Sequence, residues 1–408
     1  MTLTTSGRRK RVEFDVKYTG QSSLRDTPAQ IIVRQGLNRH DVVEVIYQQT
    51  QPWMSTLTTG VPVSIGWGNQ SGLHNIAGYV THTSPITSVT INQPAKVFCV
   101  GATFPLKERG TDLWLDYTAP QIARLIARKF RLGIHVDDDT TYRLPQVAQA
   151  GRTYWEVLLD IADRAGYVVR CEGVTIIFRR RDAMIDSGMA SAPVLSMGGE
   201  LKNAGNLSPE RSLWHFRPKI GGYLESGPSL AAQSVAGVDP VTAEYVSTTS
   251  TPGGNSLRKV SYDPYFTDFP SDRVVTSHYM AQKTSEAKSE RVRMSVQADA
   301  TAAGDARTRP GMPVYVRGTG STTDGYWLVD SVNHTLFASG EYEMELKLVT
   351  DSIGESAGGS FRPSSPPSRP LRDLGPTAMV AERPYLTPNL LPARSGTTGQ
   401  YWAAGGSK

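Results

Sequence analysis

Alternating apolar and polar residues dominate the first quarter of the chain. Val12, Phe14, Val16 and Tyr18 alternate with polar residues, which is typical of a half-buried β-strand. Further short apolar runs rich in β-branched residues lie at 31–33, 41–47, 62–67, 77–81, 88–91 and 96–100. Pro62 indicates an edge strand or the first residue of a strand. Many short strands at close spacing predict a small barrel or sandwich over residues 12–109.

The centre of the chain, 110–192, changes to helical spacing. Thr118 and Gln121 have the spacing of a capping box, which marks a helix start. The apolar positions that follow at helical spacing are Ile122, Leu125, Ile126 and Phe130. Gly133 is predicted to end this helix, because glycine commonly follows a helix C-terminus.

A second helix and a hairpin complete this central segment. Thr153 and Glu156 form another capping box, and Gly166 is the predicted stop. The apolar face of this helix consists of Val157, Leu158, Ile161, Ala162 and Ala165. Strand-like runs at 167–171 and 174–178 flank Glu172 and Gly173, which predicts a hairpin with its turn at these two residues. Residues 184–192 are predicted to form a loop, and 110–192 to form a compact α+β insert.

Strand patterns resume after residue 193. The candidate strands are 212–223, 258–262, 291–298, 313–316, 325–329, 331–336 and 342–349. The polar, Gly/Ser/Thr-rich stretch 231–255 is predicted to be an extended loop, and 271–289 to be a helix. These features predict a second small barrel over 193–350.

The two ends of the chain differ in composition from the rest. Residues 1–11 include four consecutive basic residues and are predicted to form a flexible arm. Residues 351–408 are rich in proline and poor in apolar residues, so they cannot build a core of their own. The sparse apolar residues of this tail favour an extended strap laid over a neighbour. The predicted fold is therefore mainly β: two small β-barrel domains flanking a helix-helix-hairpin domain, with an extended Pro-rich C-terminal tail.

Composition and charge fit an ordinary globular protein. The 408 residues are 39% hydrophobic and 20% charged, and the net charge of +5 is too dilute to indicate specific nucleic-acid binding. No run approaches 18 apolar residues, and the N-terminus is polar, so neither a transmembrane helix nor a signal peptide is expected. Cys99 and Cys171 both lie in predicted strands, which favours buried free thiols and synthesis in a reducing cytoplasm.

Motifs for catalysis or for metal and cofactor binding are missing from the sequence. It contains no nucleotide-binding glycine loop, no nucleophile elbow and no HExxH. The seven histidines, at 40, 74, 82, 135, 215, 278 and 334, are scattered. A Cys99–His135 nucleophile pair is disfavoured because Cys99 lies in mid-strand. The acidic run 137–139 lacks the calcium-loop pattern. We therefore predict no catalytic residue, no metal ligand and no cofactor.

Three blocks of the chain resemble the tail hub, or baseplate hub, proteins of tailed bacteriophages. The first is "HDVVEVIYQQ…GVPVSIGWG…AGYVTHTSP…AKVFCVGATFPLKE", which resembles the first barrel of that family. The second is the insert, "TAPQIARLIARKF", then "LPQVAQAGRTYWEVLLDIADRAGYVV" and "GVTIIF". The third, "TRPGMPVYVRGTGSTTDGYWLVDSVNHTLFASGEYEMELKLV", resembles the closing barrel segment. Contractile injection systems share this late-control-D-like family, and the blocks cover most of residues 10–350.

The resemblance implies a structural role in the virion. Hub proteins of this family form homotrimers in which two barrels per subunit build a ring of six, and the ring adapts the sixfold tail tube to the threefold tip. The implied partners are distal tail or tube proteins above and spike or fibre proteins below. The tape measure protein would lie in the lumen, DNA would pass only in transit, and the C-terminal tail would bind a neighbour.

Two other functions stay open at this point. A receptor-binding or carbohydrate-binding tip protein would need an aromatic cleft, whereas the Trp residues at 53, 67, 114, 155, 214, 327 and 402 are spread singly. A cell-wall hydrolase would need a pair of carboxylates, whose partners meet only in the fold. The resemblance itself implies no enzymatic activity.

Overall fold

The computed structural model describes residues 12–19, 27–48, 53–54, 57–69, 72–84, 94–137, 143–197, 212–219, 233–238, 243, 245–250, 282, 285–286, 296–320 and 323–350. All of these lie in one compact unit, Met1–Ser360. The predicted arm 1–11, the Pro-rich tail 351–408 and the strands predicted at 88–91 and 258–262 lie outside the described residues.

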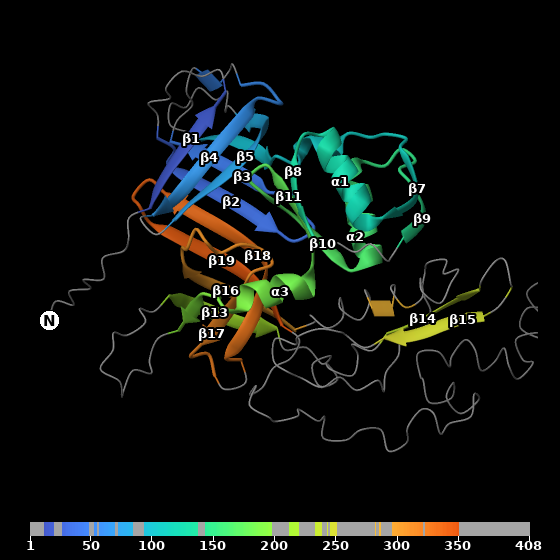
Figure 1. Cartoon of the computed structure of the whole chain (residues 1–408). Coiled ribbons are helices and arrows are strands. Elements are labelled where there is room, and N and C mark those ends of the chain that lie inside the picture. Colours follow the sequence, from blue (N-terminus) through green and yellow to red (C-terminus); the bar gives the residue numbers. More distant parts are fainter. Residues whose placement is uncertain are drawn as a thin grey trace, which may run out of the picture. The chain divides into compact units, whose positions relative to one another are not determined.

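One twelve-stranded sheet contains most of the strands (Figure 1). Its members are β1 (Glu13–Tyr18), β2 (Gln30–Gly36), β3 (Val42–Tyr47), β4 (Pro62–Asn69), β5 (Gly72–Ser84), β6 (Ala95–Gly101), β12 (Val194–Ser196), β13 (Leu213–Lys219), β16 (Val296–Ala303), β17 (Pro313–Arg317), β18 (Gly325–Phe337) and β19 (Tyr342–Thr350). The order is β1-β4-β5-β6-β3-β2-β18-β19-β16-β13, with β17 beside β18 and β12 beside β17. The prediction of a mainly β chain is confirmed.

The first lobe consists of β1 to β6, which surround one hydrophobic core. The predicted alternation in β1 is confirmed, since Glu13, Asp15 and Lys17 are exposed. Pro62 begins β4, which lies between β1 and β5, so it marks a strand start within the sheet. Trp67 is fully buried in this core, and its Nε1 donates to the hydroxyl of Tyr342 at 3.2 Å. Because β4 and β19 are far apart in the sheet order, this contact shows that the sheet rolls back on itself.

Strand β18 joins the two halves of the sheet by changing its partner. Its first part pairs with β17, and its second part, from Ser331 onward, pairs with β2. A register shift between Val329 and Ser331 lies at this change, as a β-bulge does where pairing is redirected. The same strand supplies Trp327 to one core and Leu336 to the other. The two strand-rich parts of the chain are therefore one hydrogen-bonded sheet with two cores.

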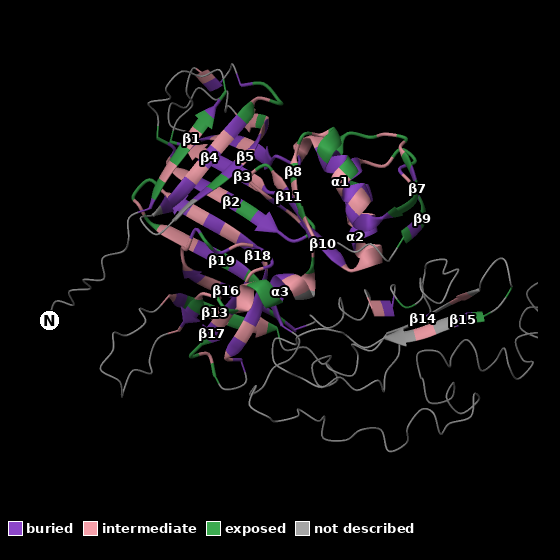
Figure 2. Cartoon of the chain, in the orientation of Figure 1, coloured by how far each residue is buried: buried purple, intermediate pink, exposed green. Residues whose placement is uncertain are grey.

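The second lobe consists of β12, β13 and β16 to β19. Its ring closes where the backbone N–H of Ser212 donates to the carbonyl of Ser196 at 3.0 Å, next to β13 and β12 respectively. Across the interior, Phe216 meets Trp327 edge to face at 5.4 Å between ring centroids. The burial pattern in Figure 2 alternates along these strands, with apolar residues inward. The strands of this lobe therefore enclose a second core of their own.

The central insert combines two helices with two small sheets. Its elements are β7 (Leu113–Thr118), α1 (Ala119–Lys129), β8 (Gly133–Val136), β9 (Arg143–Ala148), α2 (Tyr154–Ala165), β10 (Tyr167–Glu172) and β11 (Thr175–Arg180). Both predicted capping boxes are confirmed: the N–H of Gln121 donates to Thr118 Oγ1 at 3.3 Å, and the N–H of Glu156 to Thr153 Oγ1 at 3.1 Å. Gly166 ends α2 in the left-handed conformation, as predicted.

Three local predictions in the insert are wrong by small shifts. Helix α1 ends at Lys129, and Arg131 rather than Gly133 adopts the left-handed conformation, with φ of 54°. Leu125 lies on the exposed face of α1 and is 37% exposed. The hairpin turn falls on Gly173 and Val174, because Glu172 pairs with Thr175.

Two predicted loops are regular structure instead. The loop predicted at 184–192 is largely α3 (Arg181–Met189), which has no side-chain cap and contains Gly188, so the usual signals for a helix are missing. The loop predicted at 231–255 contains the ribbon of β14 (Gln233–Val238) and β15 (Tyr245–Ser250). Small Ser, Thr and Gly residues in these strands hid the alternation. Of the helix predicted at 271–289, only residues 282 and 285–286 are described, and they are helical.

Candidate functional site

The tight turn between β2 and β3 is where the two lobes and the insert meet. Asn38 in this turn adopts the left-handed conformation, with φ of 57°. Its backbone N–H donates to the carbonyl of Val169 at 2.7 Å, and its side-chain Oδ1 accepts from the N–H of Val169 at 2.9 Å. Asn38 therefore extends the edge of β10 and ties the first lobe to the insert.

His40 makes a second connection to the insert from the same turn. Its ring stacks on Trp155 of α2 with centroids 4.2 Å apart, and its Nδ1 lies 2.8 Å from Thr103 Oγ1. Burial, helped by the nearby charge of Lys107, lowers the pKa of His40 to about 4. The ring is thus neutral at physiological pH and packs against Trp155.

Charged groups at the same junction connect the insert to both lobes. Asp41 is 2% exposed, accepts from Gln35 Nε2 at 3.2 Å, and has its pKa raised to about 7 by burial, an effect that Gln35 and Arg170 oppose. On the insert, Glu172 pairs with Arg170 at 3.0 Å and also with Arg309 of the second lobe. The charge pairs and the Asn38 turn hold three parts of the chain in one arrangement.

Replacing Asn38 by alanine is expected to lower the free energy of unfolding by about 2–5 kcal/mol. The buried N–H of Val169 would lose its acceptor, which costs about 1–3 kcal/mol, and alanine in the left-handed region costs about 1–2 kcal/mol more. Urea unfolding measures the change. Asn38→Gly is the matched control: it loses the hydrogen bond without the backbone strain, so it should recover about 1 kcal/mol of the loss. Equal stability of both variants and the wild type would contradict this role for Asn38.

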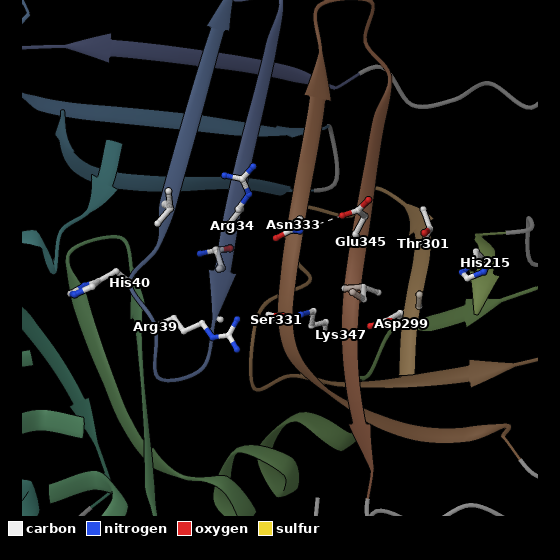
Figure 3. Close-up of a pocket in the computed structure, with 15 residues that line it drawn as sticks. Arg34, Arg39, His40, His215, Asp299, Thr301, Ser331, Asn333, Glu345 and Lys347 are labelled. Carbon is white, nitrogen blue, oxygen red and sulfur yellow. Dashed lines mark hydrogen bonds between the residues drawn. The ribbon is translucent and has the colours of Figure 1, made fainter. Parts of the chain in front are cut away.

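A polar groove of about 700 Å³ runs across the outward face of five strands at this junction (Figure 3). Cross-strand pairing arranges its side chains in two ladders over β2, β18, β19, β16 and β13. The first ladder is Arg34, Asn333, Glu345, Thr301 and His215, and the second is Gly36, Ser331, Lys347 and Asp299. The groove therefore presents alternating cations, anions and hydrogen-bonding groups along a nearly straight line.

The cysteines are placed as expected, as buried free thiols. Cys99 lies in the first core and Cys171 in β10 of the insert. Burial raises the pKa of each thiol to about 12, so neither forms a thiolate near neutral pH. This argues against the Cys99–His135 pair considered above.

Acidic and aromatic candidates are mostly engaged in the fold. Asp137 accepts from Arg179 Nε at 2.8 Å and from the N–H of Arg180, so it holds the end of the insert hairpin. Trp67 and Trp327 are fully buried in the two lobe cores, out of reach of a sugar. Among the described residues, no group of three or more His, Cys, Asp or Glu side chains is placed to hold a metal ion.

The groove was not predicted from the sequence. Its two main cations, Arg39 and Lys347, come from opposite ends of the chain and meet only because β2 pairs with β18 and β18 with β19. The alternation of apolar and polar residues in β19 does place Lys347 on the outward face. This alternation was the one feature of the sequence that pointed to a groove residue. None of the described helices is long and apolar enough to cross a membrane.

The chain is similar in structure to tail proteins of phages and to a secretion-system component. A 43 kDa tail protein of prophage MuSo2 from Shewanella oneidensis matches with TM-score 0.59 and 15% identity, over 84% of this chain and 99% of that protein. A tail protein from Neisseria meningitidis MC58 matches with TM-score 0.59 and 12% identity, over 84% of this chain and 98% of that protein.

A third similar structure is the c3393 protein of E. coli, a type VI secretion component described as similar to the T4 tail proteins gp27 and gp5. It matches with TM-score 0.53 and 12% identity, over 83% of this chain and 77% of that one. No protein-family model and no curated protein sequence matches the chain. The expected resemblance is confirmed at the level of structure: this chain has the fold of these phage tail proteins.

Proposed function

We propose that this chain is a structural component of a phage tail and acts there as the hub of the tail tip or baseplate. The observation that carries the proposal is the sheet with two lobes and a central insert, an architecture matched over 99% of the length of a prophage tail protein. The proposal gives the chain no catalytic role and no cofactor, and it places the protein in the virion after synthesis in the host cytoplasm.

The two lobes support a trimeric ring as the working form. The described strands of each lobe surround a core of their own, so one chain offers two similar β modules. Three chains would present six modules with approximate sixfold symmetry, matching a sixfold tube on one side and a threefold tip on the other. Tube or distal tail proteins and spike or fibre proteins are the proposed neighbours, with the tape measure protein and DNA in the lumen.

Immunogold labelling of the tailed particles that contain this chain tests its position. An antibody against the purified chain should label one end of the tail, opposite the head. A preimmune serum is the control. Labelling along the whole tube, on the head, or on no particle at all would remove the proposal.

The Pro-rich tail 351–408 is proposed to bind a neighbouring subunit or protein. Its composition provides scattered apolar anchors without a core, which suits an extended segment laid over another surface. Truncation after Thr350 should leave a core with the unfolding transition of the full chain that fails to join assembled tails. Normal incorporation of the truncated chain into tails would show that the segment is dispensable for assembly.

A further inference from the structure

Two cations in the groove lack a carboxylate partner within the described part of the chain. Arg34, at the rim, pairs with Glu44 at 3.3 Å, and Asp299 pairs with Lys219 at 3.1 Å. No described carboxylate pairs with Arg39 or with Lys347, although both line the groove. These two side chains also line a second hollow of about 230 Å³, so they lie where the two hollows meet.

The backbone brings Arg39 and Lys347 to opposite sides of one serine. Gly36 stands opposite Ser331 in the second ladder, and the side chain of Arg39 lies over this glycine: a Cβ added there would be 3.2 Å from Arg39 Cδ. Lys347 pairs with Ser331 across the next strand. In Figure 3, Arg39 and Lys347 reach toward Ser331 from opposite sides.

Ser331 adds a hydroxyl to the floor of this space. The residue is only 9% exposed, and no described group hydrogen-bonds its hydroxyl. Two cations on either side of a serine hydroxyl without a hydrogen-bond partner form a site for an oxyanion, since charge-assisted hydrogen bonds are about twice as strong as neutral ones.

The rest of the groove selects among oxyanions. Glu345 and Asp299 line the same groove, and their negative charges repel a nucleic-acid backbone, which carries a phosphate at every residue. A peptide carries isolated charges of either sign, so it can match both the cations and the carboxylates. Five strands spaced about 4.8 Å apart span about 19 Å, the length of about six residues of extended chain.

We propose that the groove binds an extended acidic segment of another protein chain, with one Asp or Glu carboxylate held by Arg39, Lys347 and Ser331. This inference rests on the groove alone and does not depend on the hub proposal. A donor side chain on either side of that carboxylate would meet Glu345 or Asp299. The site thus recognises a carboxylate within a peptide.

Binding of a labelled, blocked six-residue peptide, Ser-Gln-Glu-Gln-Ser-Gly, to the full chain tests the proposal, because this peptide carries one carboxylate between donor side chains. Its affinity is measured by fluorescence anisotropy. The Arg39→Gln/Lys347→Gln variant should bind about ten-fold more weakly, equivalent to about 1.4 kcal/mol. The matched control, Arg128→Gln/Arg131→Gln, removes the same charge from exposed positions on the insert and should change the affinity less than about two-fold. Equal weakening by both double variants would show only general charge attraction and overturn the site.

A second variant and two competing ligands sharpen the result. Ser331→Asp places a carboxylate between the two cations and should abolish peptide binding while raising the melting temperature of the chain. Unchanged peptide binding by Ser331→Asp would overturn the proposal. Tighter binding of oligo-dT through the same cations would identify a nucleic-acid site. Glutarate binding as tightly as the peptide would identify a small-anion site, and either outcome would contradict an extended segment.

Discussion

Replacing Gly304 by alanine is expected to destabilise the chain by about 2–6 kcal/mol, because the new methyl group would displace Tyr342. A Cβ on Gly304 would lie 2.1 Å from Cγ of the Tyr342 ring, far inside van der Waals contact. The Gly304 N–H also donates to the Tyr342 carbonyl at 3.0 Å, so the backbone cannot easily withdraw. Overpacking of this kind typically costs about 1–3 kcal/mol.

The additional cost comes from the hydrogen bonds that Tyr342 makes. Its hydroxyl accepts from Trp67 Nε1 at 3.2 Å and shares a second hydrogen bond with His334 Nδ1, 2.9 Å away. This relay joins β4, β19 and β18 and closes the first lobe. Breaking a buried hydrogen bond and leaving one partner unpaired costs about 1–3 kcal/mol.

Urea unfolding of the full chain, followed by tryptophan fluorescence, measures the effect of Gly304→Ala. Gly66→Ala is the matched control, because its added Cβ would approach nothing closer than the His74 carbonyl at 3.8 Å; it should cost no more than about 1 kcal/mol. In the background of Tyr342→Ala, the Gly304 substitution should add little. Full additivity of the two substitutions would show that Gly304 does not act through Tyr342.

Stability is expected to fall by at least about 3 kcal/mol between pH 6.5 and pH 4, because two buried histidines resist protonation. Burial lowers the pKa of His74 to about 4 and that of His334 to about 3, against an ordinary value near 6.5. Between these values the unfolded chain binds more protons than the folded chain, so stability is present above pH 6.5 and is lost as the pH falls.

Asp41 acts in the opposite direction and sets the size of the effect. Its folded pKa of about 7 lies above the ordinary value of 3.8, so its contribution to stability falls as the pH rises through that window. With two imidazoles acting against one carboxyl, the unfolded chain binds about one more proton than the folded chain. One such proton changes the free energy of unfolding by about 1.4 kcal/mol per pH unit. His40, which is also neutral at pH 6, adds to the loss in acid.

The pH dependence is measured as urea midpoints from pH 4 to pH 7.5. His334→Asn keeps a hydrogen-bonding side chain beside Tyr342 but cannot titrate. The stability of this variant should therefore vary less steeply with pH, by about 1.4 kcal/mol per pH unit. Asp41→Asn should vary more steeply, because the opposing carboxyl is gone. Parallel curves for the wild type and both variants would contradict the assignment of the pH dependence to these groups.

Features set by neighbouring residues were predictable from the sequence. The capping boxes at Thr118 and Thr153 depend on residues three positions apart, and the left-handed end at Gly166 depends on glycine itself. The alternation in β1 likewise reflects a single strand facing one core. Where the local signal was weak, as in α3 without a cap, the prediction failed.

Features that depend on distant pairing were not predictable in detail. The sequence does not show that β18 leaves β17 at its bulge and continues beside β2, which is what joins the two lobes. The groove depends on the same pairing, since Ser331 meets Gly36 only across it. Arg39 lies over the same glycine, where an added Cβ would come within 3.2 Å of Arg39 Cδ. One sequence alone does not reveal which distant strands pair with each other.

The mass of the purified chain in solution, combined with negative-stain images of the same sample, tests the hub account most directly. A trimeric hub should appear as a threefold ring with a central hole and have a mass about three times 44.4 kDa. Six lobes should be visible around the hole, two from each chain. A compact particle that keeps the mass of one chain as the protein concentration rises would contradict it.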